Sequence, residues 1–225
     1  MMWTEFALML LVLANLRLLG GSRLLACIST AAFQGVVLGL LPLTVASWPL
    51  DPRIVLLSLL SLLIKGWGLP VLLRKALRET SVNREIQPIV SLNLSLLFGL
   101  AVLALSGWLG SRLPLPTSAS ALGAPVAFFT LFTGLFLVVA RRQALTQVLG
   151  YLVLENGIFL FGVLFAHSTP WIVEVGVLLD LLVGVFVMGI TLFHINRAFD
   201  AIDSDRLAQL HDLAVQRPSP TEPTE

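Results

Sequence analysis

The sequence predicts an all-α polytopic membrane protein with about seven transmembrane helices. Hydrophobic residues make up 57% of the 225 positions, and charged residues only 12%. A soluble domain carries about 25% charged residues and could not bury so much apolar surface. The apolar runs are continuous and do not alternate with polar residues, which favours helices over the strands of a membrane barrel. A soluble enzyme, a disulfide-rich secreted domain and a disordered regulator are therefore excluded.

Seven apolar segments have about the length that a membrane span needs, roughly 20 residues. We expect helices over 5–19, 24–43, 54–73, 89–109, 121–140, 144–166 and 171–195. Proline, serine and charged residues fill the connections, as is typical of loops. Three regions are predicted: four N-terminal helices in 1–120, a three-helix unit in 121–200 and a cytoplasmic tail in 201–225. The tail is expected to contain one short helix and then a disordered, proline-rich end.

The basic residues predict the orientation. Eleven of the fourteen Lys and Arg residues fall on one side of the predicted spans. Arg53 and Arg112 fall on the other side, and Lys65 lies inside a span. Because cytoplasmic loops carry the excess of Lys and Arg, the N-terminus is expected outside and the C-terminus in the cytoplasm. We therefore expect a multi-pass protein located in the inner (plasma) membrane.

The composition argues against a cofactor. The chain has one cysteine, so it cannot supply ligands for an iron–sulfur cluster or a Cys-based zinc site. Of its three histidines, His167 and His194 fall at opposite ends of one predicted helix and His211 lies in the tail. It also lacks the glycine-rich phosphate-binding motifs. We therefore expect no cofactor, no metal and no nucleic-acid partner, which leaves acid–base chemistry or ion movement.

Three ionisable residues are predicted near the middle of the bilayer: Lys65, Glu155 and Asp180. Counted from the cytoplasmic ends of their spans, they lie about 15, 18 and 22 Å deep, and Gln34 lies at about 15 Å. A charge at the bilayer centre costs roughly 3 kcal/mol. Desolvation disfavours the charged forms of both acids and lysines, so a layer of this kind suits lateral proton transfer. The alternative is a structural Lys65–Glu155 ion pair that only holds helices together.

Two further ionisable residues lie near the ends of the last span. Glu174 near the outer end could gate access or simply reach the lipid headgroups. His194 near the cytoplasmic end could relay protons or extend to the interface. In the third span, Gly66, Gly68 and Pro70 follow Lys65 closely, which predicts a broken helix with access for water.

Several of these residues lie in motifs that resemble a known family. The run Gly150-Tyr151-Leu152-Val153-Leu154-Glu155-Asn156-Gly157, after Arg141-Arg142-Gln143, is similar to hydrogenase-4 component E. So are the run from Val173 to Asp180, the Lys65 to Pro70 segment and Gln34. The C-terminal half also resembles the K subunit of respiratory complex I. Asp180 matches the acid of that subunit's third helix, and Glu155 lies one turn beyond the position of its second-helix acid.

The resemblance implies a non-redox, non-catalytic subunit of a hydrogenase-4 or formate-hydrogenlyase-like oxidoreductase complex. Its partners would be antiporter-like membrane subunits and a peripheral redox arm. Proton transfer would involve Glu155, Asp180 and Lys65, with Glu174 and His194 as further candidates. Arg141 and Arg142 would anchor the loop to lipid headgroups or to a neighbouring subunit. Two alternatives stay open: a structural assembly subunit, and a small autonomous proton or cation transporter. The absence of an obvious inverted repeat argues against the transporter.

Overall fold

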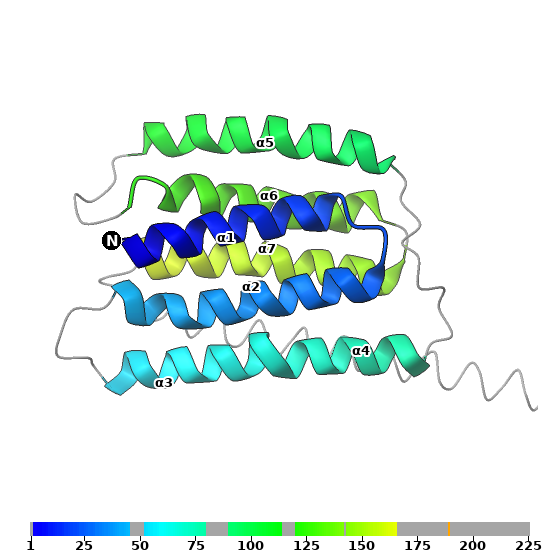
Figure 1. Cartoon of the computed structure of the whole chain (residues 1–225), viewed down its shortest axis with the longest axis horizontal. Helices are drawn as coiled ribbons and strands as arrows, with labels where there is room; N and C mark the ends of the chain where they lie inside the picture. Colours follow the sequence, from blue (N-terminus) through cyan, green and yellow to red (C-terminus); the bar gives the residue numbers. More distant parts are fainter. Residues whose placement is uncertain are drawn as a thin grey trace, which may run out of the picture.

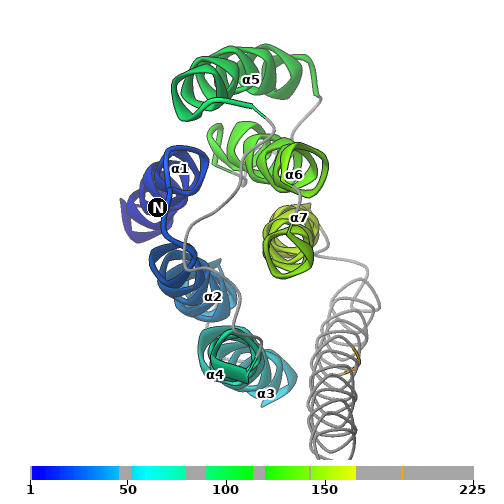
Figure 2. The same ribbon diagram turned by 90° about the vertical axis from the view of Figure 1, so that its right-hand side faces the viewer.

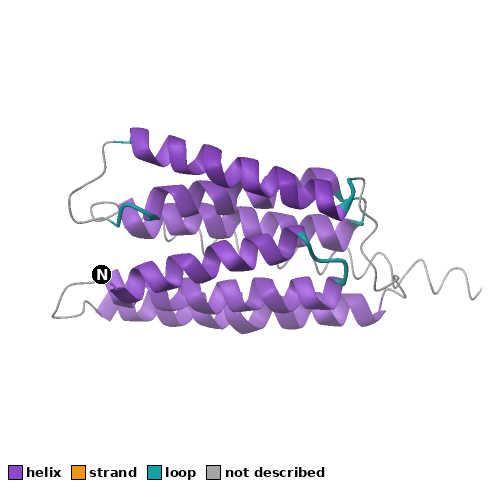
Figure 3. Ribbon diagram, turned by 45° about the horizontal axis from the view of Figure 1, so that its top comes forward, coloured by secondary structure: helices purple, strands orange, loops and turns teal. Residues whose placement is uncertain are grey.

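The computed structural model describes residues 2–45, 52–79, 90–113, 120–141, 143–165 and 189. These residues form helices and short connections, with no strand among them (Figure 3). The helices are α1 (Met2–Leu19), α2 (Leu24–Val45), α3 (Pro52–Ser61), the π-helix η1 (Leu62–Gly68), α4 (Leu69–Glu79), α5 (Leu92–Arg112), α6 (Gly123–Ala140) and α7 (Ala144–Phe165). The predicted all-α class is confirmed.

Within these ranges, six helical segments are long and apolar enough to cross a membrane. Because α3, η1 and α4 follow one another without a gap, they form one span over Ile54–Arg78. The first six predicted spans are therefore confirmed as elements, with their ends shifted by a few residues. The seventh, 171–195, and the tail after it lie outside the described residues.

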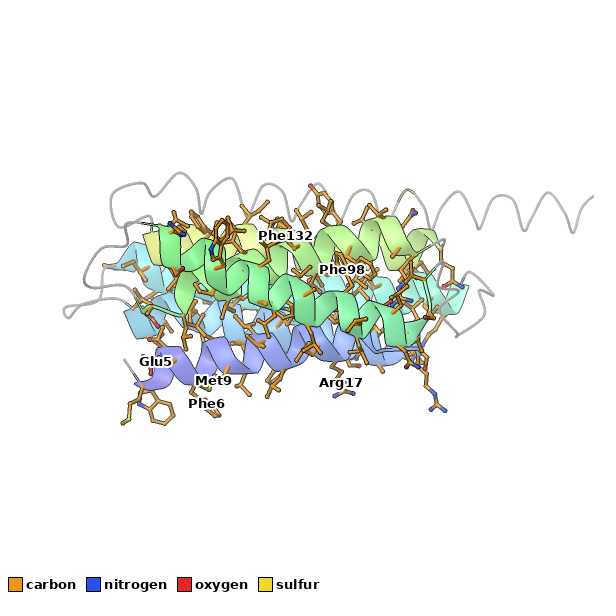
Figure 4. All side chains as sticks on the ribbon, turned by 90° about the horizontal axis from the view of Figure 1, so that it is seen from above. Glu5, Phe6, Met9, Arg17, Phe98 and Phe132 are labelled. Carbon is orange, nitrogen blue, oxygen red and sulfur yellow. The ribbon has the colours of Figure 1, made fainter. Side chains whose placement is uncertain are left out.

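The spans run alternately in opposite directions, so each end of the bundle collects one set of connections (Figure 1). One end holds most of the described positive charge, and we call it the basic end: Arg17, Arg23, Arg74, Lys75, Arg78 and Arg141. Glu5 lies toward the other end of α1, and both Glu5 and Arg17 are exposed (Figure 4). The basic end is the predicted cytoplasmic side.

Glycines set the closest helix contact, between α6 and α7. A Cβ built on Gly134 would overlap the backbone of Leu154. A Cβ on Gly150 would lie 2.7 Å from the backbone nitrogen of Val138, and one on Gly157 would lie 2.5 Å from that of Leu131. In a bilayer, small residues let two helices approach closely and gain van der Waals contact. This packing fixes the rotation of α7 against α6.

A second glycine-lined contact places α2 against η1. Gly35 and Gly39 are four residues apart and therefore lie on one face of α2. A Cβ on Gly35 would lie 2.5 Å from the carbonyl oxygen of Lys65, and one on Gly39 would lie 2.9 Å from the Cα of Leu62. The helices meet side by side in the end-on view (Figure 2). Close approach at Gly35 fixes the depth of Lys65.

The buried hydrophobic core is divided into two clusters. One lies toward the basic end and contains Leu18, Cys27, Ile28, Leu73 and Leu152 among others. The other lies toward the opposite end and contains Leu8, Leu38, Leu41, Phe159 and Leu160 among others. Buried polar side chains lie between the two clusters, and we call them the polar belt: Asn15, Gln34, Lys65, Thr130, Glu155 and Asn156.

Candidate functional site

An ion pair forms the charged half of the polar belt. Lys65 Nζ lies 2.5 Å from Glu155 Oε1 and also contacts Oε2. The two side chains are 3% and 1% exposed. Both residues stand near the middle of their spans, Ile54–Arg78 and Leu145–Leu164. The pair therefore lies near the bilayer midplane and joins the third span to α7.

Neighbouring groups complete the surroundings of the ammonium. Nζ donates to Asn156 Oδ1 at 3.3 Å, so its three N–H groups face three oxygen acceptors. The same nitrogen lies 4.6 Å from the centroid of the Phe159 ring, a distance at which the ring face attracts a cation. Asn156 and Phe159 both belong to α7. One helix thus provides the carboxylate, the amide and the aromatic ring.

Lys65 belongs to a π-helical segment, Leu62–Gly68. The backbone N–H of Leu69 donates to the carbonyl oxygen of Ile64, which is the i→i+5 spacing of a π-helix. Pro70 follows directly and, lacking an N–H, cannot continue that ladder. The prediction of a broken helix in this span is wrong, because the helix continues and only its hydrogen-bond spacing changes. Such segments occur often at functional sites.

Neutral side chains form the other half of the belt, between α1, α2 and α6. Asn15 Nδ2 donates to Thr130 Oγ1 at 2.7 Å, and Gln34 Nε2 donates to Asn15 Oδ1 at 2.8 Å. The Thr130 hydroxyl donates in turn to the Val126 carbonyl at 2.8 Å. Gln34 Oε1 is buried without a hydrogen-bond partner in the described structure. Gln34 was predicted at this level, whereas Asn15 and Thr130 were missed.

A small cavity adjoins the ion pair. Its volume of about 10 Å³ is at the lower limit for one water molecule. The polar groups on its wall are Lys65, Glu155 and Asn156. The remaining described lining residues come from α2, α4 and α7: Ile28, Ala31, Leu69, Pro70, Leu73 and Leu152. The cavity thus lies where the α3–α4 span, α2 and α7 meet around the charged groups.

Of the predicted proton-transfer residues, the structure brings Lys65 and Glu155 together. Asp180, Glu174 and His194 lie outside the described residues, so their distances from the pair stay predictions. Within the described ranges, no three His, Cys, Asp or Glu side chains form a group that could hold a metal ion.

The predicted role of Arg141 does not fit its position. The residue is 1% exposed, and its Nη2 donates to the carbonyl oxygen of Leu19, at the end of α1, at 3.3 Å. Burial lowers the pKa of its guanidinium. Gln147 Nε2 donates to the Arg141 carbonyl oxygen at 3.1 Å. Arg141 therefore links α1 to the α6–α7 connection inside the protein, and Arg142, predicted to share its role, lies outside the described residues.

Comparisons with known proteins bear on the same region. A family model described as NADH-ubiquinone/plastoquinone oxidoreductase chain 4L matches residues 124–214. The uncharacterized protein Rv0085 of Mycobacterium tuberculosis is 31% identical over 211 residues, which cover 92% of this chain and 96% of Rv0085. The chain belongs to the Rv0085 family. The similarity extends over almost the whole length of both chains.

The expected likeness to hydrogenase-4 component E is confirmed over part of this chain. The Escherichia coli K12 and Shigella flexneri proteins of that name are 34% identical over 100 residues, which cover 44% of this chain and 45% of theirs. No solved structure matches. The chain 4L match contains Glu155 and Asn156, whereas Lys65 lies before it. The ion pair thus joins the 4L-like part to the part that precedes it.

Proposed function

We propose that this Rv0085-family chain is a non-redox membrane subunit of a complex related to respiratory complex I and to hydrogenase-4. In that complex, the Lys65–Glu155 pair takes part in proton translocation. The observation that carries the proposal is a buried ammonium–carboxylate contact near the middle of two spans. The chain 4L match and the likeness to hydrogenase-4 component E support the type of complex.

The pair has a simple proton chemistry. The Lys65 ammonium can pass a proton to the Glu155 carboxylate, which leaves a neutral amine and a neutral carboxylic acid. The transfer takes place within one hydrogen-bonded contact, so this first step needs no third group. Glu155 then passes the proton on, and Lys65 is reprotonated from a second donor. Without either partner the transfer cannot occur.

Asp180 is the proposed next acceptor, since its predicted depth is close to that of Glu155. Glu174 and His194 are proposed as access groups at the two ends of the predicted seventh span, 171–195. Antiporter-like subunits and a peripheral redox arm are the proposed partners, in the plasma membrane. Large exposed apolar residues on α1, such as Phe6 and Met9, provide a face for lipid or for a neighbouring membrane subunit (Figure 4).

A structural assembly role is the second candidate. The three N–H groups of the ammonium all face oxygen acceptors, and the pair directly bridges two spans. A pair that only fastens helices would show the same geometry. On this view, changes at Lys65 or Glu155 lower the amount of assembled complex, while the protons moved by each assembled complex stay normal.

The test compares proton pumping per assembled complex in native membrane vesicles. Glu155→Gln and Asp180→Asn keep the shape of the side chains but remove their ability to exchange a proton. We expect each to lower pumping at least ten-fold. Glu5→Gln is the matched control, because Glu5 is an exposed carboxylate in the first turn of α1, and it should leave pumping unchanged. Normal pumping in both the Glu155→Gln and the Asp180→Asn variants would contradict the proposed function.

A further inference from the structure

The cavity beside the ion pair is asymmetric. Each apolar residue in its described lining lies on the basic-end side of Lys65 and Glu155. On α2, Ile28 and Ala31 precede Gln34; on α7, Leu152 precedes Glu155; and on the third span, Leu69 and Leu73 follow Lys65. Given the helix directions in Figure 1, all five positions are displaced toward the basic end.

The polar groups on the wall fit a water molecule. Lys65 Nζ, the Glu155 carboxylate and the Asn156 amide border a space of about 10 Å³. A buried water needs two to four polar partners and about that volume. The other wall residues are apolar and cannot hold water on their own, so a water here is anchored at the charged end of the cavity.

We infer that this cavity is a water-access site, which connects the Lys65–Glu155 pair with the basic end between α2, α4 and α7. The described lining extends toward the basic end as far as Leu73 and Ile28, each 1% exposed, so water would have to pass these two side chains to hydrogen-bond at Lys65. The hydration itself does not depend on the proposed function. That the water acts as the second donor, which returns a proton to Lys65, rests on the proposed function.

Both sides of the pair are packed with buried apolar residues, but the described lining of the cavity extends to one side only. The cluster toward the opposite end fills that side with Leu38, Phe159 and Leu160, each at most 4% exposed. None of these three is in the described lining of the cavity. We therefore expect no water path from that side through the described helices.

Cysteine accessibility tests the inference in membranes that contain the whole complex. In a Cys27→Ala background, Ala31→Cys probes the cavity wall and Leu38→Cys probes the opposite side. The two positions lie two turns apart on the same face of α2 and are 7% and 0% exposed. Ag⁺ is the probe, because it is small enough to reach a thiol through a narrow water-filled opening. Ser22→Cys, exposed in the α1–α2 connection, identifies the basic side.

We expect Ala31→Cys to react at least ten-fold faster than Leu38→Cys, and only when Ag⁺ is added on the side at which Ser22→Cys reacts. Equal rates for the two buried cysteines, or reaction of Ala31→Cys from the other side, would overturn the inference. Pumping by Ala31→Leu, which fills the cavity, tests the proton-supply role separately. If Ala31→Cys reacts fast and Ala31→Leu pumps normally, the water site stands but its role in supplying protons is contradicted. If Ala31→Cys does not react, the water site is contradicted, and the proposed function is then decided by the pumping of Glu155→Gln.

Discussion

The two halves of the polar belt perform the same packing task with different chemistry. Asn15, Gln34 and Thr130 join α1, α2 and α6 through neutral hydrogen bonds of 2.7–2.8 Å. Lys65 and Glu155 join the third span to α7 through opposite charges. Both halves are buried, and both lie between the same two hydrophobic clusters. Of the two halves, only the charged half contains side chains that ionise.

This difference bears on why a charge pair is present at all. A hydrogen bond between helices in a membrane contributes about 0.6 kcal/mol on average, and it needs no desolvation of ions. A buried ion pair is often no more stabilising than apolar residues of the same volume. The neutral half shows that this bundle fastens helices without charges. The comparison therefore favours a role in ion movement for Lys65 and Glu155.

The largest expected effect comes from removing one member of the pair. Lys65→Ala or Glu155→Ala leaves the other charge buried without its partner, which costs about 3–5 kcal/mol. We expect a severe loss of assembled complex, measured by quantitative blotting of detergent extracts. A yield close to that of the wild type would show that the pair lies in a wetter site than its burial indicates.

A smaller effect is expected when the pair is displaced by crowding. Gly35→Leu places a side chain against the carbonyl of Lys65, which must move α2 away from η1. Overpacking of this kind costs about 1–3 kcal/mol. The thermal midpoint of the solubilised complex should fall, and so should pumping per complex. Gly107→Leu is the control, because a Cβ at Gly107 meets nothing within 4 Å. Equal effects of Gly35→Leu and Gly107→Leu would contradict the importance of the α2–η1 contact.

The smallest effect is expected in the neutral half. Asn15→Leu removes the hydrogen bonds to Thr130 and Gln34, and an interhelical hydrogen bond in a membrane contributes about 0.6 kcal/mol on average. Thermal stability should therefore fall modestly, while pumping per assembled complex stays normal. If Asn15→Leu abolishes pumping in a fully assembled complex, the functional distinction between the two halves of the belt is wrong.

The sequence predicted the spans and the pair because both depend on simple properties. Continuous apolar runs mark the helices, and counting residues from the span ends places Lys65 and Glu155 at one level. The structure then shows them in contact, although 90 positions separate them along the chain. The predicted involvement of Gln34 was right in depth, but its partner is Asn15 on α1.

Other features could not be read from the sequence. A π-helical segment of seven residues is too short to change the apolar pattern, so Gly66, Gly68 and Pro70 predicted a break instead. The partner of a glycine depends on tertiary packing, and nothing local to Gly150 or Gly157 indicates α6 as the neighbour. Arg141 likewise has the sequence context of a loop residue, yet it is buried because its guanidinium reaches the end of α1.

The most direct test replaces both members of the pair at once with apolar residues of similar size, Lys65→Met with Glu155→Leu. No buried charge is left unpaired, so assembly should return to near the wild-type level. Proton pumping per assembled complex is the measurement. A role in proton translocation predicts that pumping stays at least ten-fold below wild type although the complex assembles. Normal pumping by the assembled double variant would contradict that role and leave Lys65 and Glu155 with a purely structural one.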